Sequence, residues 1–113
     1  MLNSNLTDLN KYKSVASICQ LEIARSKVAK QENLINEYKN SKREDKPLSD
    51  YFSEHFKKTL LCLSDLSKLI IQEEFLNGLH KKENCWFETY FSKSTYYKKR
   101  KQAIDEFLFY YLD

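Results

Sequence analysis

The chain has 113 residues, and 19 basic residues against 16 acidic residues give it a net charge of +3. This length suffices for one domain with a modest core and argues against a second independent domain. With a single glycine, Gly78, and a single proline, Pro47, the chain has too few turn residues for a sheet fold. We therefore predict one all-α domain, a helical bundle, over residues 1–113.

No apolar run approaches the roughly 20 residues that are needed to cross a bilayer. The first residues, MLNSNLTDLNKYK, also lack the apolar centre of a signal peptide. We therefore expect a cytoplasmic protein that makes no contact with a membrane.

The three cysteines, Cys19, Cys62 and Cys85, are widely separated, and none belongs to a CxxC pair. Because each has apolar or aromatic neighbours, we interpret them as reduced packing residues. His55 and His80 have no companion at metal-ligand spacing. We therefore predict neither a metal site nor a cofactor.

The first predicted helix covers residues 7–40, which contain neither glycine nor proline. Apolar residues recur there at steps of three, four and seven, as in an amphipathic helix, and Thr7 or Asp8 is suited to be its N-cap. The polar stretch 40–47 follows, and Pro47 at its end resists continuation of the helix, so we expect this stretch to be a linker. At about 1.5 Å per residue the helix is about 50 Å long, so it either bends around the domain or extends as a dimerising arm.

The second helical region begins at Ser49 or Asp50 and runs to Leu79, with Gly78 near its end. It is the most apolar part of the chain, and its wide apolar stripe predicts a helix that packs against more than one neighbour. We expect it to be the central core element. A short helix over residues 84–90 and a final helix from Ser92 to about Tyr111 complete the bundle.

Positive charge is concentrated in one window. Residues 81–102 contain seven basic and two acidic residues, a net charge of +5, whereas the rest of the chain has a net charge of −2. Between Ser92 and Gln102 no acid interrupts the run. This window therefore accounts for the whole positive excess.

The same window lies within a candidate helix-turn-helix over residues 83–108. It reads as a short apolar helix, a tight turn at Tyr90 and Phe91, and a second helix for which Ser92 is the N-cap. Trp86 and Phe87 are expected to be the core that holds the two helices together. The second helix has a packing side, formed by Tyr96, Ala103, Ile104, Phe107, Leu108 and Tyr111, and a polar side, formed by Thr95, Lys98, Lys99 and Gln102.

This segment, CWFETYFSKSTYYKKRKQAIDEFL, resembles the helix-turn-helix of sigma-factor region 4 and of small phage transcriptional regulators from low-GC Gram-positive hosts. The matching residues are Ser92, Ser94, Thr95, Tyr97, Lys98, Lys99 and Ala103. Tyr90 stands where such motifs often have glycine, and Arg100 stands at a position that is usually apolar, so it must reach out of the packing face or the helix must be rotated. The composition, rich in Lys, Asn, Tyr and Phe, resembles that of small uncharacterised proteins from AT-rich bacteria such as Mollicutes.

The resemblance implies that the second helix enters the DNA major groove. The residues expected to contact base edges are Thr95, Lys98 and Gln102. Those expected to contact phosphates are Lys93, Lys99, Arg100 and Lys101, with Lys81 and Lys82 on the flanking backbone. Tyr97 either contacts the sugar-phosphate backbone or covers the helix surface as an exposed aromatic.

An enzyme is not expected, because the chain has no Gly-rich phosphate loop, no nucleophile elbow and no recognisable Ser-His or Cys-His arrangement. The acid pairs Glu73–Glu74 and Asp105–Glu106 read as helix-surface residues. The alternative to DNA binding is a helical protein–protein interaction module that uses the first helix or the apolar tail 107–113, on another protein or on itself. A basic helix with tyrosines also permits RNA binding.

Overall fold

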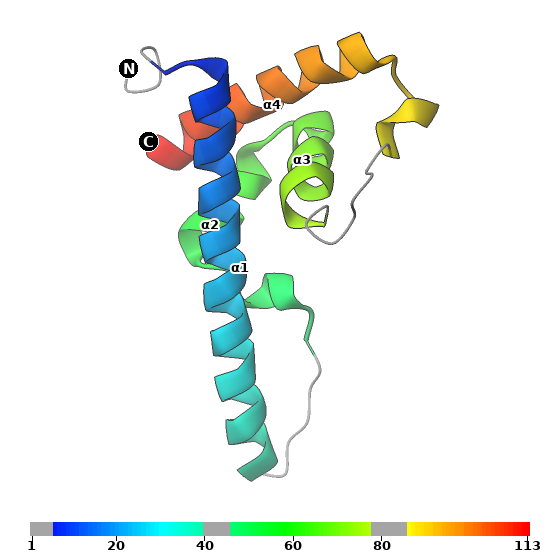
Figure 1. Ribbon diagram of the computed structural model, residues 1–113. Helices are drawn as coiled ribbons and strands as arrows, with labels where there is room; N and C mark the ends of the chain where they lie inside the picture. The colour runs from blue at the N-terminus through cyan, green and yellow to red at the C-terminus, as the bar shows by residue number, and fades with distance from the viewer. Residues whose placement is uncertain (1–5, 40–45, 78–85) are drawn as a thin grey trace.

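The computed structural model of the protein describes residues 6–39, 46–77 and 86–113. Within these ranges the chain forms helices and turns (Figure 1), and the predicted all-α fold is confirmed. The helices are α1 (Asp8–Lys39), α2 (Glu54–Cys62), α3 (Asp65–Ile71) and α4 (Lys93–Leu112). They are joined by two 3-10 turns, η2 (Leu48–Tyr51) and η5 (Trp86–Thr89), and by a π-helical turn, η3 (Gln72–Leu76).

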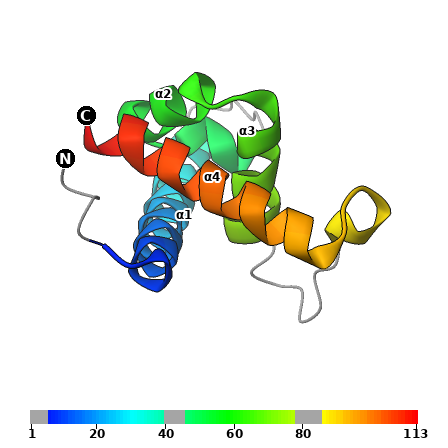
Figure 2. The ribbon, with the colours of Figure 1, turned by 90° about the horizontal axis from the view of Figure 1, so that it is seen from above.

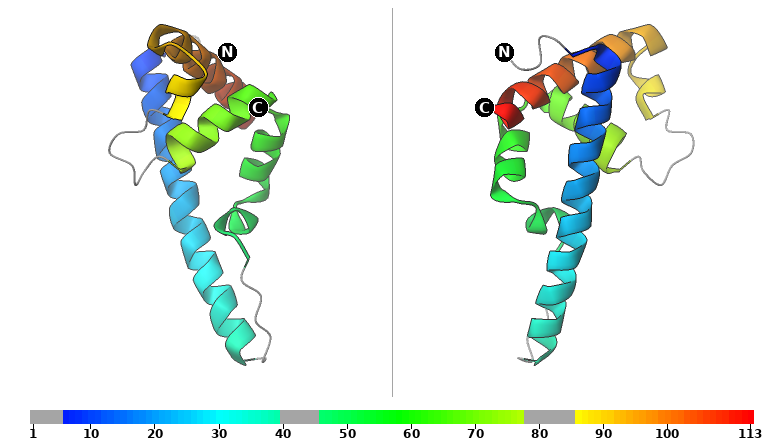
Figure 3. Two further views of the ribbon diagram at one scale, coloured as in Figure 1. Left: turned by 90° about the vertical axis from the view of Figure 1, so that its right-hand side faces the viewer. Right: turned by 60° about the vertical axis from the view of Figure 1, so that its left-hand side comes forward.

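The first helix has the length that the sequence predicts. Its N-cap is Thr7, whose side-chain oxygen accepts a hydrogen bond from the backbone N–H of Asn10 at 3.1 Å. The sequence left open whether so long a helix bends around the domain or extends from it. It extends, because the second half of α1 runs well past α2, α3 and α4 (Figure 3). The molecule is accordingly elongated, with extents of 51 × 35 × 22 Å.

The central apolar region is not one helix, as we had predicted, but several short ones. The backbone is extended at Phe52 and Ser53, and again at Leu63 and Ser64. Ser53 caps α2 by accepting a hydrogen bond from the N–H of Phe56 at 3.2 Å. Phe52 and Leu63, which directly precede these two serines, are both buried in the core.

The predicted role of this region as the centre of the core is confirmed. α2 and α3 pack against α4, and α4 lies across the first turns of α1 (Figure 2). The buried apolar side chains come from every described helix, and they are Val15, Cys19, Phe52, Phe56, Leu60, Leu63, Ile70, Ile71, Phe75, Phe87, Tyr96, Ala103, Ile104, Phe107 and Leu108.

One carboxylate connects three parts of this arrangement. Glu74, in the π-helical turn η3, accepts a hydrogen bond from the hydroxyl of Tyr12 on α1 at 2.8 Å. Its other oxygen accepts a hydrogen bond from the hydroxyl of Tyr96 on α4 at 2.6 Å. The guanidinium of Arg100, also on α4, lies 3.7 Å from the carboxylate. Glu74 is therefore a partly buried joint between α1 and α4, whereas the sequence suggested a helix-surface acid.

Removal of this charge should destabilise the fold. We expect Glu74→Gln to lower the free energy of unfolding by about 1–3 kcal/mol, since hydrogen bonds to a charged group are lost and Arg100 is left without its counter-ion. Urea denaturation followed by circular dichroism measures the change. Glu54→Gln is the matched control, because the Glu54 side chain is 93% exposed. An equal, small effect for the two variants would show that Glu74 does not hold the helices together.

Candidate nucleic-acid interface

The basic helix α4 begins where the sequence predicts. Ser92 has extended backbone angles, φ −66° and ψ 161°, and its side-chain oxygen accepts a hydrogen bond from the N–H of Thr95 at 3.3 Å. This N-cap satisfies one of the donors that the first turn leaves unpaired. The predicted cap is confirmed, and the helix starts directly before the acid-free basic run.

The described part of the element before α4 is a 3-10 turn and not an α-helix. Residues 86–89 form this turn, η5, where a helix was expected over 84–90, and residues 83–85 lie outside the described residues. The N–H groups of Tyr90 and Phe91 both donate to the carbonyl of Phe87, each at 2.9 Å. In its described part the candidate motif therefore has a single turn ahead of the basic helix.

Aromatic packing holds this turn on α4. The ring of Phe87 is stacked on that of Tyr96, with centroids 3.9 Å apart, and Trp86 meets Tyr96 edge-on at 5.6 Å. Phe87 is buried and Trp86 is partly buried. Their predicted role, as the core that joins the two parts of the motif, is confirmed.

The two sides of α4 separate as predicted. The residues assigned to the packing side are buried, except for Tyr111, which is half-buried and stacks on Phe107 with centroids 5.4 Å apart. The tail docks on α2, because Tyr111 also lies against the ring of His55, 4.6 Å between centroids. These contacts fix the rotation of α4 about its own axis, and that rotation determines which of its residues face the solvent.

The outer side of α4 presents Thr95, Lys98 and Gln102 as exposed residues, with Lys99 half-buried beside them, and Lys93 is exposed at the first position of the helix. Within the described part of the chain, none of the three lysines has an ion pair. The Thr95 hydroxyl accepts a hydrogen bond from the Ser92 hydroxyl at 2.9 Å and keeps its own proton to donate. This side thus combines positive charge that no ion pair compensates with side chains that can still donate or accept hydrogen bonds.

Arg100 occupies a different environment from the one we had assigned. Its guanidinium lies 4.7 Å from the ring centroid of Tyr12 and 4.7 Å from that of Tyr97, close to Glu74. The side chain is only 27% exposed. Arg100 thus faces α1 and is engaged by two rings and a carboxylate, so the phosphate contact predicted for it would require it to give up these partners. Tyr97, which lies against this guanidinium, is itself exposed, and both of its predicted roles stay predictions.

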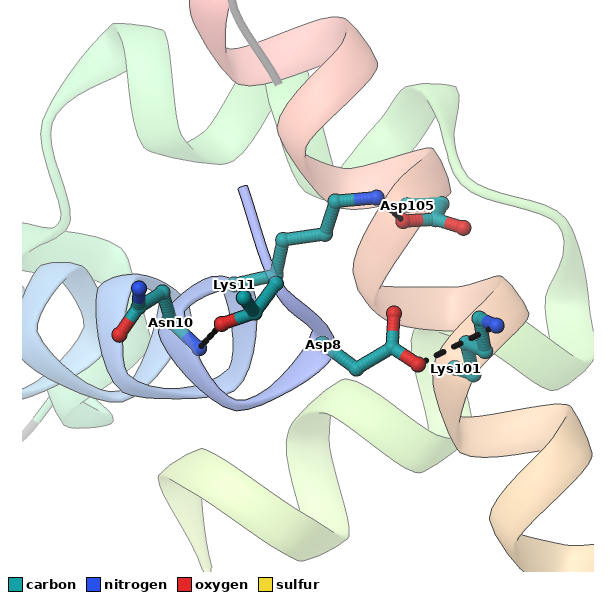
Figure 4. Close-up of polar contacts among 6 residues, drawn as sticks. Asp8, Asn10, Lys11, Lys101 and Asp105 are labelled. Atoms are coloured by element: carbon teal, nitrogen blue, oxygen red, sulfur yellow. Dashed lines mark hydrogen bonds and ion pairs between the residues drawn. The ribbon is translucent and has the colours of Figure 1, made fainter. Parts of the chain in front are cut away.

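Lys101 is also engaged by α1, although much more loosely. It forms an ion pair of 3.2 Å with Asp8, and Lys11 forms one of 3.0 Å with Asp105 (Figure 4). Both members of the Lys101–Asp8 pair are more than half exposed, and such pairs contribute little stability. Lys101 is therefore held only loosely, whereas Arg100 is held by partly buried contacts.

A groove of about 320 Å³ lies between the first turns of α1 and the middle of α4. Tyr12, Tyr97 and Ile104 contribute apolar surface to it, and charged side chains such as Lys98 and Lys101 border it. Its lining has four basic residues, Lys11, Lys98, Arg100 and Lys101, against two acidic ones, Asp8 and Asp105, a net charge of +2. Net positive charge is therefore found both in the groove and on the outer side of α4, with Lys98 at the border between them.

Several of the residues that build this region were not anticipated from the sequence. Tyr12, Glu74 and Lys11 meet α4 from distant parts of the chain, and Glu106 on α4 accepts hydrogen bonds from the backbone N–H of Ser64 at the start of α3. The one available signal was an acid inside the most apolar segment, at Glu74. Such a residue needs partners when it is buried.

The other sequence-based site predictions have mixed outcomes. Cys19 is buried, and burial raises the pKa of its thiol to about 12, which keeps it protonated and unreactive. Cys62 is exposed, so its predicted packing role is wrong. The positions of Lys81, Lys82 and Cys85 lie outside the described residues, as does that of His80.

No group of three or more His, Cys, Asp or Glu side chains within residues 6–39, 46–77 and 86–113 is arranged to hold a metal ion. No helix in these ranges is long and apolar enough to cross a membrane.

Comparisons of the chain with protein-family models, with curated proteins and with solved structures found no significant match. The resemblance of residues 85–108 to sigma-factor region 4 and to phage regulators therefore remains a prediction. What the region can do has to be inferred from its own side chains.

Alkaline pH should weaken the contact between α1 and α4 through Tyr12. Burial and the hydrogen bond to Glu74 raise the pKa of Tyr12 from 10.0 to about 12. Tyrosine in the unfolded chain therefore loses its proton first, so the free energy of unfolding should fall as the pH rises from about 10 to about 12. Urea denaturation at several pH values should show a shallower fall for Tyr12→Phe than for the wild type. Tyr110→Phe, on the exposed tail, should leave the slope unchanged, and an unchanged slope for Tyr12→Phe would contradict the assignment.

Proposed function

We propose that the protein binds double-stranded DNA through the outer side of α4 and acts as a DNA-associated regulatory or accessory protein. The observation that carries this proposal is the set of three lysines, Lys93, Lys98 and Lys99, which have no ion pair among the described residues. Thr95 and Gln102 lie among them, and no acid lies between Ser92 and Gln102. A polyanion with hydrogen-bonding groups along its surface is the partner that this chemistry fits.

The shape of the molecule supports the proposal. The first half of α4 projects beyond α1 (Figure 2), so its outer side is accessible. An α-helix with side chains is about 10–12 Å wide and fits the DNA major groove, which is about 12 Å wide. Thr95, Lys98 and Gln102 follow one another at steps of three and four residues and therefore share one face.

We assign different tasks to the residues of this face. Gln102 suits adenine, Lys98 suits guanine, and the Thr95 hydroxyl can donate to either kind of acceptor on a base edge. Lys99 at the side of the face and Lys93 at the start of the helix would contact phosphates, joined by Lys101 when it exchanges Asp8 for DNA. Arg100 would act indirectly, by fixing the rotation of the helix.

The sequence-independent part of the binding should depend on Lys98 and Lys99. We expect Lys98→Ala/Lys99→Ala to weaken binding to mixed-sequence duplex DNA and to reduce the slope of log K against log salt by about 2, since two positive charges that face the polyanion are lost, whichever group each lysine contacts. Fluorescence anisotropy over a salt series measures both quantities. Lys13→Ala/Lys58→Ala removes the same charge from exposed positions on α1 and α2 and should change little.

Two results would contradict the proposal. One is a folded wild-type protein that does not bind DNA at about 50 mM salt, where phosphate contacts contribute most. The other is an equal loss of affinity for the two double variants, which would mean that net charge alone attracts the DNA. The first result would favour the alternative, a helical protein–protein interaction module without a nucleic-acid role.

Sequence preference should depend on Thr95 and Gln102. After selection of a preferred duplex from a random pool, Thr95→Ala and Gln102→Ala should each weaken binding to that duplex by about 1–3 kcal/mol. Their binding to mixed-sequence DNA should change little. Thr89→Ala and Gln20→Ala are matched controls at exposed positions on η5 and α1. A selection that yields no preferred sequence would mean that α4 binds the backbone alone.

A further inference from the structure

The extended helix α1 carries a row of exposed apolar side chains. Leu21, Val28 and Ile35 are 65%, 56% and 53% exposed, and each follows the last by seven residues. Ala24 and Gln31, which are also exposed, lie between them. We call residues 21, 24, 28, 31 and 35 the outer stripe of α1.

The outer stripe does not belong to the core of the domain. The face of α1 that packs against the domain carries Val15, Cys19, Glu22 and Ser26, all of which are buried. Further along the same face, the amide of Asn33 donates a hydrogen bond of 2.8 Å to the hydroxyl of Tyr51 in η2. At 100° per residue, the outer stripe lies on the opposite side of the helix. The helix thus has one face packed against the domain, with buried apolar and polar residues, and a second, mainly apolar face in solvent.

The spacing of the outer stripe is that of a coiled coil. Apolar residues that recur every seven positions, with further contacts three residues after each, occupy the a and d positions of heptads. Leu21, Val28 and Ile35 are then a residues, and Ala24 and Gln31 are d residues. Val28 and Ile35 are β-branched, as a residues of parallel two-stranded coiled coils often are, whereas the d positions hold Ala and Gln in place of the usual Leu.

Charges beside the outer stripe fit a second copy of the same helix. In this register Lys27 is a g residue and Glu32 is the e residue of the next heptad, five positions later. In a parallel two-stranded coiled coil, such g and e residues of opposite chains lie side by side. Both side chains are exposed, and neither has an ion pair within the described part of its own chain.

We propose that the protein forms a parallel homodimer through the outer stripe of α1, with Lys27 of each chain paired to Glu32 of the other. The apolar side chains of the stripe leave water in the dimer, and the two lysine–glutamate pairs fix the register and the parallel direction. An antiparallel pair would bring Glu32 towards Arg25 instead, so the role of Lys27 distinguishes the two directions. The dimer does not depend on DNA binding by α4.

The direct test is the oligomeric state without DNA. Sedimentation equilibrium at protein concentrations up to about 100 µM, above the dissociation constants of most specific protein pairs, should show a dimer of the wild type. Val28→Asp should raise the dissociation constant by about 30-fold or more, as expected for a residue at the centre of an interface. Leu61→Asp, at an exposed apolar residue of α2, should leave it unchanged. A wild type that stays monomeric, or equal dissociation constants for the two variants, would overturn the proposal.

Charge reversal tests the parallel register without an apolar substitution. Lys27→Glu and Glu32→Lys should each weaken the dimer, because like charges then face each other, and the double variant should restore it. The helical content by circular dichroism should stay the same in all three, since both positions are exposed. Failure of the double variant to restore the dimer would exclude this register and the parallel arrangement with it.

Discussion

The Glu74 carboxylate is the contact on which the geometry of this protein depends. It accepts hydrogen bonds from Tyr12 of α1 and Tyr96 of α4 and lies near the guanidinium of Arg100. A carboxylate with so little exposure is costly unless its oxygens are paired, so these partners must be in place together. With Tyr96 and Arg100 turned inward, Lys98 is turned outward. The same contact therefore sets the crossing of the helices and the face that α4 presents.

The sequence was enough to predict the helical class, the ends of α1, the Ser92 cap and the two sides of α4. Each of these features depends on neighbours within a few positions of the chain. The breaks at Ser53 and Ser64 were missed, because the buried residues Phe52, Phe56, Leu60 and Leu63 follow at steps of three and four, the spacing that a continuous helix would also have. The position of Arg100 was missed for a different reason, because its partners on α1 and η3 are far away in the sequence.

Structure also changes how the basic window is understood. By sequence alone its lysines and arginine form one cationic segment, but α1 supplies Asp8 to Lys101, and Glu74 faces Arg100. Among the described residues of this window, the lysines left without an ion pair are Lys93, Lys98 and Lys99, in the first half of α4 at one end of the molecule (Figure 1). The outer stripe of α1 lies along the extended half of that helix, away from this end (Figure 1). A polyanion and a second copy of the chain could therefore be bound at the same time.

The measurement that tests the central claim most directly is an NMR titration of the ¹⁵N-labelled protein with duplex DNA. Binding through the outer side of α4 predicts that the largest shifts of backbone amide signals fall between Ser92 and Gln102, while amides of the outer stripe of α1 stay unchanged. Shifts that are absent, or that cluster on α1 or α2 instead, would contradict the assignment of α4 as the DNA-binding element.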